Sequence, residues 1–128
     1  IMRRYMMKIA CRVARQNECE ALVTGESVGQ VASQTIQAIA CTDEACDMPV
    51  LRPVIGMDKD EIVIISRKID TFETSILPYE DCCTVFTPKH PRTKPQLKFV
   101  KFAEDEMNAE ELINRAIENI EQLNISNS

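Results

Sequence analysis

Residues 21–35 read Ala-Leu-Val-Thr-Gly-Glu-Ser-Val-Gly-Gln-Val-Ala-Ser-Gln-Thr, and this stretch decides the predicted fold. Its first three residues are apolar and are bounded by Gly25, which predicts a short buried strand over 20–24. Ser27 and Gln30 have capping-box spacing, which predicts that a helix begins after Ser27. The predicted core stripe of this helix is Val28, Val31, Ala32, Thr35, Ile36 and Ile39. A small-residue turn before a helix N-terminus presents backbone N–H groups to a phosphate or a nucleotide.

Helices and short strands are predicted to alternate on both sides of this stretch. Helical spacing predicts a helix over 1–16, with Met2, Met6, Ile9 and Val13 on one apolar face. After an acidic loop over 41–48, residues 50–55 read as an edge strand interrupted by Pro53. Asp58 and Glu61 predict the start of a helix that turns Ile62, Ile65 and Ile69 inward. An extended segment over 72–79, a proline-rich loop over 80–97 and a helix from Asn108 to Leu123 complete the prediction.

This alternation predicts an α/β protein with helices packed on a sheet. At 128 residues the chain forms one domain or part of one. No apolar run approaches the ~20 residues that cross a bilayer, and the basic start Ile1-Met2-Arg3-Arg4 is not a signal peptide. We therefore expect no membrane association and a cytoplasmic location, where the six cysteines are reduced. Their spacing fits no zinc motif, and no metal ligands are predicted.

The net charge of −5 hides two basic segments without acidic residues, 1–16 and 89–101. In the first, a stripe of basic side chains runs along one helix face: Arg4, Lys8, Arg12 and Arg15. This stripe is either a solvated helix surface or a surface that faces RNA phosphates. Arg3 lies off the stripe, on the other flank of the apolar face.

Cys82 and Cys83 are adjacent in a polar, proline-punctuated loop that then becomes basic. Lys89, His90 and Arg92 favour a reactive thiolate, whereas the preceding Glu80-Asp81 pair opposes it. From these residues alone, buried inert cysteines and reactive cysteines both stay open.

Four segments together resemble the tRNA 4-thiouridine synthetases, also called thiamine-biosynthesis sulfurtransferases. The segment 24–35 is similar to the second nucleotide-contacting element of that family. Residues 49–59 (Pro-Val-Leu-Arg-Pro-Val-Ile-Gly-Met-Asp-Lys) and 75–83 (Ser-Ile-Leu-Pro-Tyr-Glu-Asp-Cys-Cys) are similar to its following segments. Arg3-Arg4-Tyr5-Met6-Met7 is similar to its R-R-M-M helix, so the resemblance covers about residues 2–95 in the family's order.

The resemblance implies a Rossmann-like, three-layer ATP-pyrophosphatase domain of the adenine-nucleotide hydrolase type, with helices on both faces of the sheet. Such an enzyme uses ATP to adenylate O4 of a uridine in tRNA, and persulfide sulfur from a cysteine desulfurase then displaces AMP. It also supplies sulfur for thiamine thiazole synthesis. Arg3, Gly25 and Gln34 fall on nucleotide-contacting positions, and the sulfur-handling cysteine matches Cys82 or Cys83, of which Cys82 is favoured.

The family's phosphate-gripping S-G-G-x-D-S loop is not in these residues, nor are its ferredoxin-like and THUMP regions. We therefore expect residues 1–128 to be the C-terminal portion of the pyrophosphatase domain, inactive alone, and to self-associate through uncovered apolar faces. Mg²⁺ is expected to accompany ATP in the parent protein. The alternatives are a nucleotide- or RNA-binding module without chemistry and a different ATP-pyrophosphatase, such as an amidating ligase.

Overall fold

The computed structural model describes residues 1–30, 34–79 and 94–125. The chain divides into two compact units, each assembled from separated segments. Unit 1 comprises Ile1–Leu22, Cys41–Val50 and Gln96–Ser128, and unit 2 comprises Val23–Ala40 and Leu51–Pro95.

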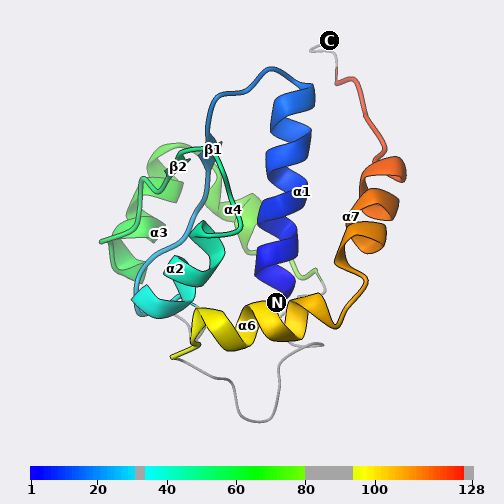
Figure 1. Cartoon of the computed structure of the whole chain (residues 1–128). Coiled ribbons are helices and arrows are strands. Elements are labelled where there is room, and N and C mark those ends of the chain that lie inside the picture. The colour runs from blue at the N-terminus through cyan, green and yellow to red at the C-terminus, as the bar shows by residue number, and fades with distance from the viewer. Residues whose placement is uncertain (31–33, 80–93, 126–128) are drawn as a thin grey trace. The chain divides into compact units, whose positions relative to one another are not determined.

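Unit 1 is built on three helices, α1 (Met2–Gln16), α6 (Leu97–Asp105) and α7 (Ala109–Glu118). Helix α7 lies beside α1, and α6 crosses near the N-terminal end of α1 (Figure 1). The core here includes Met7, Cys11 and Ala14 of α1 and Ile113 of α7. The predicted helix is therefore confirmed but its predicted apolar face is wrong: Met2 and Met6 are exposed. The face that packs repeats at 4, 7, 11 and 14, and it includes a charged residue, Arg4.

The strands β1 (Leu22–Val23) and β2 (Val50–Leu51) form a two-stranded sheet. The amide of Leu22 donates to the carbonyl of Pro49 at 2.9 Å, and that of Thr24 donates to Leu51 at 3.0 Å. The pairing advances in the same direction on both strands, so the sheet is parallel. The chain is thus α/β, and both predicted strands form, although each is shorter than expected. The first was predicted to be buried, and this is wrong, because Val23 is 68% exposed. The three-layer arrangement implied by the resemblance stays a prediction.

The helix predicted to begin after Ser27 is wrong at its start. Helix α2 spans Ile36–Asp43, and the described residues 28–30 form a turn. The hydroxyl of Ser27 donates to the carbonyl of Met57 at 2.5 Å instead of capping a helix. At its other end α2 continues through Asp43 into the predicted acidic loop. Of the predicted core stripe, Ile39 is buried and Ile36 is exposed, while Val31 and Ala32 lie outside the described residues.

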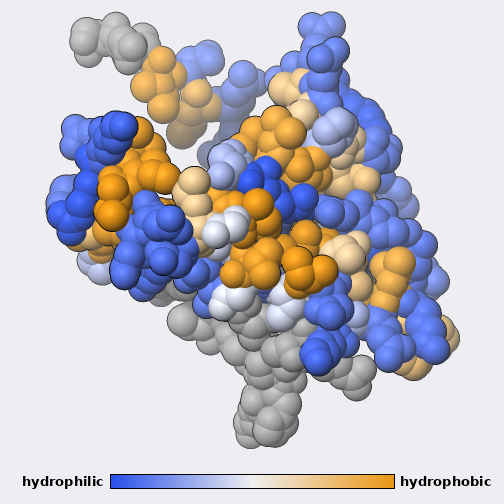
Figure 2. Space-filling model, turned by 90° about the vertical axis from the view of Figure 1, so that its left-hand side faces the viewer, coloured by the Kyte–Doolittle hydropathy of each residue, from blue (hydrophilic) through white to orange (hydrophobic). Residues whose placement is uncertain are grey.

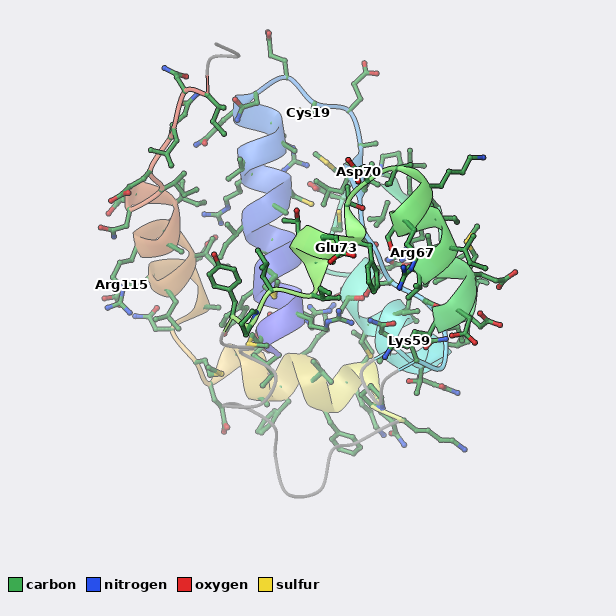
Figure 3. The ribbon with its side chains drawn as sticks, turned by 180° about the vertical axis from the view of Figure 1, so that it is seen from behind. Cys19, Lys59, Arg67, Asp70, Glu73 and Arg115 are labelled. Carbon is green, nitrogen blue, oxygen red and sulfur yellow. The ribbon has the colours of Figure 1, made fainter. Side chains whose placement is uncertain are left out.

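In unit 2, α3 (Lys59–Lys68) begins as predicted, with a complete capping box between Asp58 and Glu61. It ends at Lys68, and Asp70, two residues beyond (Figure 3), has φ +59°. The amide of Thr71 donates back to the carbonyl of Ser66 at 2.9 Å. This is the Schellman arrangement of a helix end, here without a glycine. A short helix α4 (Phe72–Ser75) follows, so the extended segment predicted over 72–79 is wrong at its start.

Apolar side chains lie at the surface on the side that carries α2 and α3 (Figure 2). Within unit 2, large hydrophobic residues with at least half of their surface exposed are Val23, Ile36, Leu51, Ile64, Ile69, Ile76, Leu77 and Tyr79. Ile62, Ile65 and Ile69 were predicted to face inward. Ile62 is half-buried, whereas the prediction is wrong for Ile65 and Ile69, which are 36% and 61% exposed. The self-association expected from the sequence stays a prediction.

The end of the chain is more helical than its sequence predicted. Helix α6 was not expected, and α7 follows Asn108 as predicted but ends at Glu118 instead of Leu123. Most of the predicted loop over 80–97 lies outside the described residues. No helix in the described part of the chain is both long and apolar enough to cross a membrane.

Candidate nucleotide-binding loop and its supporting network

The loop that follows β1 is anchored by a buried carboxylate. Glu26 is 7% exposed, and its Oε2 accepts hydrogen bonds from Thr24 Oγ1 at 3.1 Å and from Arg52 Nε at 2.8 Å. Arg52 comes directly after β2. A buried ion pair of this kind fixes the loop against the strand ends, because breaking it would leave a charge without compensation.

Ser27 and Gln34 close the same loop through the backbone. The amide N–H of Ser27 donates to Gln34 Oε1 at 3.0 Å, and the N–H of Gly29 donates to the carbonyl of Gln34 at 3.1 Å. A backbone N–H can only donate, so the side-chain atom facing it is the oxygen, and this fixes the orientation of the Gln34 amide. The Nε2 group, a double donor, has no hydrogen bond to another described residue.

Of the two glycines in this loop, only Gly29 has a backbone conformation that favours glycine. Gly29 has φ +84°, a left-handed conformation that glycine adopts without strain. Gly25 has no such backbone requirement, and no described atom lies within 4 Å of the position where a Cβ would be. The fold therefore requires a glycine at 29 and not at 25. The open space beside Gly25 is available to a ligand.

The other predicted site residues lie elsewhere. Arg3 is half-buried on α1, in unit 1, whereas Gly25 and Gln34 belong to unit 2. Gly25 and Gln34 are brought into one loop, through the bonds around Ser27. Cys82 and Cys83 lie outside the described residues.

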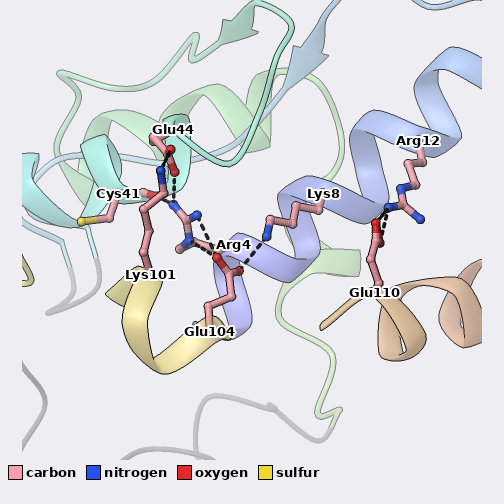
Figure 4. A network of polar contacts seen from close by, with 8 residues as sticks. All are labelled: Arg4, Lys8, Arg12, Cys41, Glu44, Lys101, Glu104 and Glu110. Atoms are coloured by element: carbon pink, nitrogen blue, oxygen red, sulfur yellow. Dashed lines mark hydrogen bonds and ion pairs between the residues drawn. The ribbon is translucent and has the colours of Figure 1, made fainter. Parts of the chain in front are cut away.

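Every member of the basic stripe on α1 is paired within unit 1, and Figure 4 shows the pairs of Arg4, Lys8 and Arg12. Arg4, 3% exposed, holds Glu104 Oε2 with two nitrogens at 2.9 and 3.1 Å, and its third contacts Glu44 Oε2 at 2.8 Å and the Cys41 carbonyl at 2.5 Å. The remaining pairs are Lys8–Glu104 at 3.0 Å, Arg12–Glu110 and Arg15–Asp47. The stripe is not a free RNA-facing surface, because carboxylates distant in sequence pair with each of its members. Part of it is nevertheless solvated, since the side chains of Arg12 and Arg15 are 35% and 52% exposed.

The sequence profile of the thiamine biosynthesis protein (ThiI) family matches residues 1–109. The chain belongs to the ThiI family. It is 61% identical over 126 residues to a probable tRNA sulfurtransferase of Acetivibrio thermocellus, covering 98% of this chain and 32% of that protein. It is 56% identical over 127 residues to a probable tRNA sulfurtransferase of Clostridium acetobutylicum, covering 99% of this chain and 33% of that one. The chain thus spans about a third of the length of the curated relatives it matches.

A solved structure is also similar to this ThiI-family chain. It is a crystal structure of a 4-thiouridine synthetase–RNA complex with bound ATP. The match has a TM-score of 0.85 at 37% sequence identity, and it covers 92% of this chain and 31% of the other. The resemblance to the 4-thiouridine synthetases, drawn from four sequence segments, is confirmed by these comparisons.

Glu104 is the residue of this ThiI-family chain that its sequence did not reveal as important. It is 5% exposed and holds both Arg4 and Lys8. A signal was present, since Glu104 stands four residues after Val100 and seven after Leu97, on the apolar side of α6. A carboxylate on the apolar side of a helix is almost never buried unless a cation pairs with it.

The same network shifts the pKa values of its carboxyl groups. Burial raises the pKa of Glu104, but hydrogen bonds from Arg4 and Lys8 outweigh burial and hold it below its usual value. Hydrogen bonds from Lys101 and Arg4 hold the pKa of Glu44 below its usual value as well. Both groups are therefore charged at neutral pH, as the pairing with Arg4 requires.

We expect the ThiI-family chain to lose stability in mild acid because of these two groups. A carboxyl group whose pKa is lower in the folded than in the unfolded protein binds fewer protons when folded. Its contribution to the free energy of unfolding is therefore complete above the pKa of the unfolded protein, near 4.5, and is lost as the pH falls through the pKa of the folded protein. As the pH is lowered from about 5 to about 3, the urea concentration at the unfolding midpoint should decrease. In Glu104→Gln the fall over this range should be shallower, and equal slopes for the two proteins would contradict the assignment.

Proposed function

We propose that this chain is the C-terminal portion of the ATP-pyrophosphatase domain of a tRNA sulfurtransferase, and that the loop from Gly25 to Gln34 binds the adenylate of ATP. The curated relatives are named for tRNA sulfur transfer, and the similar solved structure is an RNA complex with bound ATP. In the full-length protein, ATP supplies the adenylyl group that makes O4 of a tRNA uridine a leaving group. Persulfide sulfur from a cysteine desulfurase then takes the place of that oxygen.

The observation that carries the proposal is the pairing of an open glycine with an oriented amide. Gly25 leaves space beside the backbone, and the Gln34 side chain is held by Ser27 with its Nε2 donor unused by the described residues. Adenine and ribose offer acceptors for such a donor, and their flat groups need a close approach to the backbone. The polar groups are fixed before binding, which lowers the entropy cost of holding a nucleotide.

The remaining roles follow from the family resemblance. Cys82, with Cys83 beside it, receives the persulfide sulfur, and Arg3 contributes positive charge to the nucleotide. Mg²⁺ is expected with ATP in the full-length protein. In the described part of the chain, however, no three His, Cys, Asp or Glu side chains gather as a bound metal ion needs, so we assign no metal ligand here.

Alanine substitutions of Gly25 and Gly29 test the proposal. In the full-length protein, Gly25→Ala should weaken ATP binding by about tenfold or more, because a methyl group enters the ligand's space at a cost of about 1.4 kcal/mol or above. Its urea midpoint should stay close to that of the unchanged protein, since nothing in the described structure meets the added Cβ. Gly29→Ala should instead lower the free energy of unfolding by about 1 kcal/mol, because alanine is strained at φ +84°, and it should affect ATP binding less than Gly25→Ala does.

Gln34→Glu is the matched test of the amide. It keeps an oxygen to accept from Ser27 and replaces the Nε2 donor by a second acceptor. Titration calorimetry with ATP should show weaker binding for Gln34→Glu with a preserved fold. Unchanged ATP affinity in both Gly25→Ala and Gln34→Glu would remove the loop from the nucleotide site.

A further inference from the structure

Two cysteines outside the proposed site touch each other inside unit 1. Cys11 Sγ on α1 lies 2.7 Å from Cys46 Sγ, in the turn region between α2 and β2. A disulfide bond measures about 2.05 Å, so bonding requires the two sulfurs to approach by less than an ångström. Both thiols are free in the structure. Their contact crosses 35 residues of sequence, and the roles proposed above use neither of them.

The pair opens onto a surface cavity of about 380 Å³, which has room for a small thiol reagent. Cys11, Cys46 and Ile113 line it together with three basic and three acidic side chains: Lys8, Arg12, Arg15, Glu44, Asp47 and Glu110. The opposite charges balance, so the cavity does not select a reagent by its net charge. Access is unequal, because Cys11 is 3% exposed whereas Cys46 is only partly buried.

We propose that Cys11 and Cys46 are a reversible redox site that closes to a disulfide by exchange with a low-molecular-weight disulfide such as oxidised glutathione. The Cys46 thiolate attacks one sulfur of the reagent, forms a mixed disulfide and expels one glutathione thiolate. Cys11 then attacks the Cys46 sulfur and expels the second. The protein loses two protons and two electrons, and the reagent takes them up as two molecules of reduced glutathione.

The order of attack follows from the surroundings of the two thiols. Burial, reinforced by the hydrogen bond to Cys46, raises the pKa of Cys11 to about 11. At neutral pH Cys11 is therefore almost entirely protonated and is a poor first nucleophile. Once Cys46 carries the mixed disulfide, Cys11 is already in contact with the sulfur that it must attack, and the second step is intramolecular.

The test treats the full chain with oxidised glutathione under native conditions, blocks remaining thiols and maps disulfide-linked peptides. Cleavage after Lys and Arg and after Glu separates the relevant cysteines, with Cys11 in Ile9–Arg12, Cys19 in Cys19–Glu20, Cys41 in Ser27–Glu44 and Cys46 in Ala45–Lys59. A linked pair of Ile9–Arg12 and Ala45–Lys59 is expected. It should disappear on reduction, and the oxidised chain should melt at a higher temperature because its unfolded state is constrained.

Two variants keep the result decisive. In Cys11→Ser, Cys46 should hold a stable glutathione adduct, because the resolving thiol is gone. In Cys46→Ser, Cys11 should stay unmodified, while exposed Cys19 serves as the internal control for reagent access in every sample. A stable adduct on Cys46 in the unchanged chain, or no reaction at Cys46 while Cys19 reacts, overturns the proposal. Neither outcome bears on ATP binding or on Cys82, so this failure is distinguishable from failure of the proposed function.

Discussion

Cys82→Ala in the full-length protein should lower 4-thiouridine formation in tRNA by at least about a hundredfold, because the thiol that we propose as the acceptor of the persulfide sulfur is lost. ATP binding should be retained, since the proposed adenylate contacts come from Gly25 and Gln34 and not from this cysteine. The measurements are the 4-thiouridine content of digested tRNA by mass spectrometry and the affinity for ATP by calorimetry. A loss of the first with retention of the second would separate sulfur transfer from nucleotide binding.

Cys83→Ala and Cys19→Ala are the matched controls. Cys83→Ala decides which of the adjacent thiols carries the sulfur, and Cys19 is an exposed cysteine with no proposed role. If both Cys82→Ala and Cys83→Ala keep full activity, the cysteine assignment is wrong. If the tRNA product contains no sulfur at all with the unchanged protein, another ATP-pyrophosphatase reaction, such as amidation, becomes the better reading.

Arg4→Met should destabilise the protein by about 3 kcal/mol, because it leaves the buried Glu104 carboxylate without its main partner while keeping most of the side-chain volume. The expected fall in melting temperature is about 10 °C. Urea denaturation followed by circular dichroism measures the free energy of unfolding directly. The effect is large because both Arg4 and Glu104 are almost fully buried.

Arg15→Met provides the control from the same helix. The side chains of Arg15 and Asp47 are both more than half exposed, so solvent screens their ion pair and its loss should leave the urea midpoint close to that of the unchanged protein. The double variant Arg4→Met with Glu104→Leu should recover most of the stability, since an apolar pair of similar volume replaces a buried ion pair at little net cost. A double variant no more stable than Arg4→Met alone would show that the guanidinium contributes through Glu44 and Cys41 instead.

The sequence predicted structure where the deciding interactions are local. The capping box joins Asp58 to Glu61, three positions later, and its two hydrogen bonds form as expected. The similar pattern at Ser27 and Gln30 failed because the Ser27 hydroxyl bonds to Met57, thirty residues away, and its amide bonds to the Gln34 side chain. The cap pattern was the same, and tertiary hydrogen bonds decided which one formed a helix.

The sequence pointed to the candidate site only in part. The loop with Gly25 and Gln34 was located from its sequence and its likeness to a known family, whereas the fixed amide of Gln34 appears only in three dimensions. The basic stripe on α1 could not be interpreted from its own helix, because the carboxylates that neutralise Arg4 stand 40 and 100 residues away. Nothing in the spacing of the stripe itself distinguishes a surface for RNA from a set of internal ion pairs.

Unit 1 is discontinuous, with the segments of unit 2 inserted between its three parts, and this sets the order in which a growing chain can fold. Helix α1 leaves the ribosome before the other parts of unit 1, and Glu104, which holds Arg4, is synthesised 100 residues later. At a translation rate of about 5–20 residues per second, Glu104 is added roughly 5–20 s after Arg4. During translation, therefore, the apolar and basic faces of α1 are exposed together, and unit 1 can close only near the end of synthesis of this stretch.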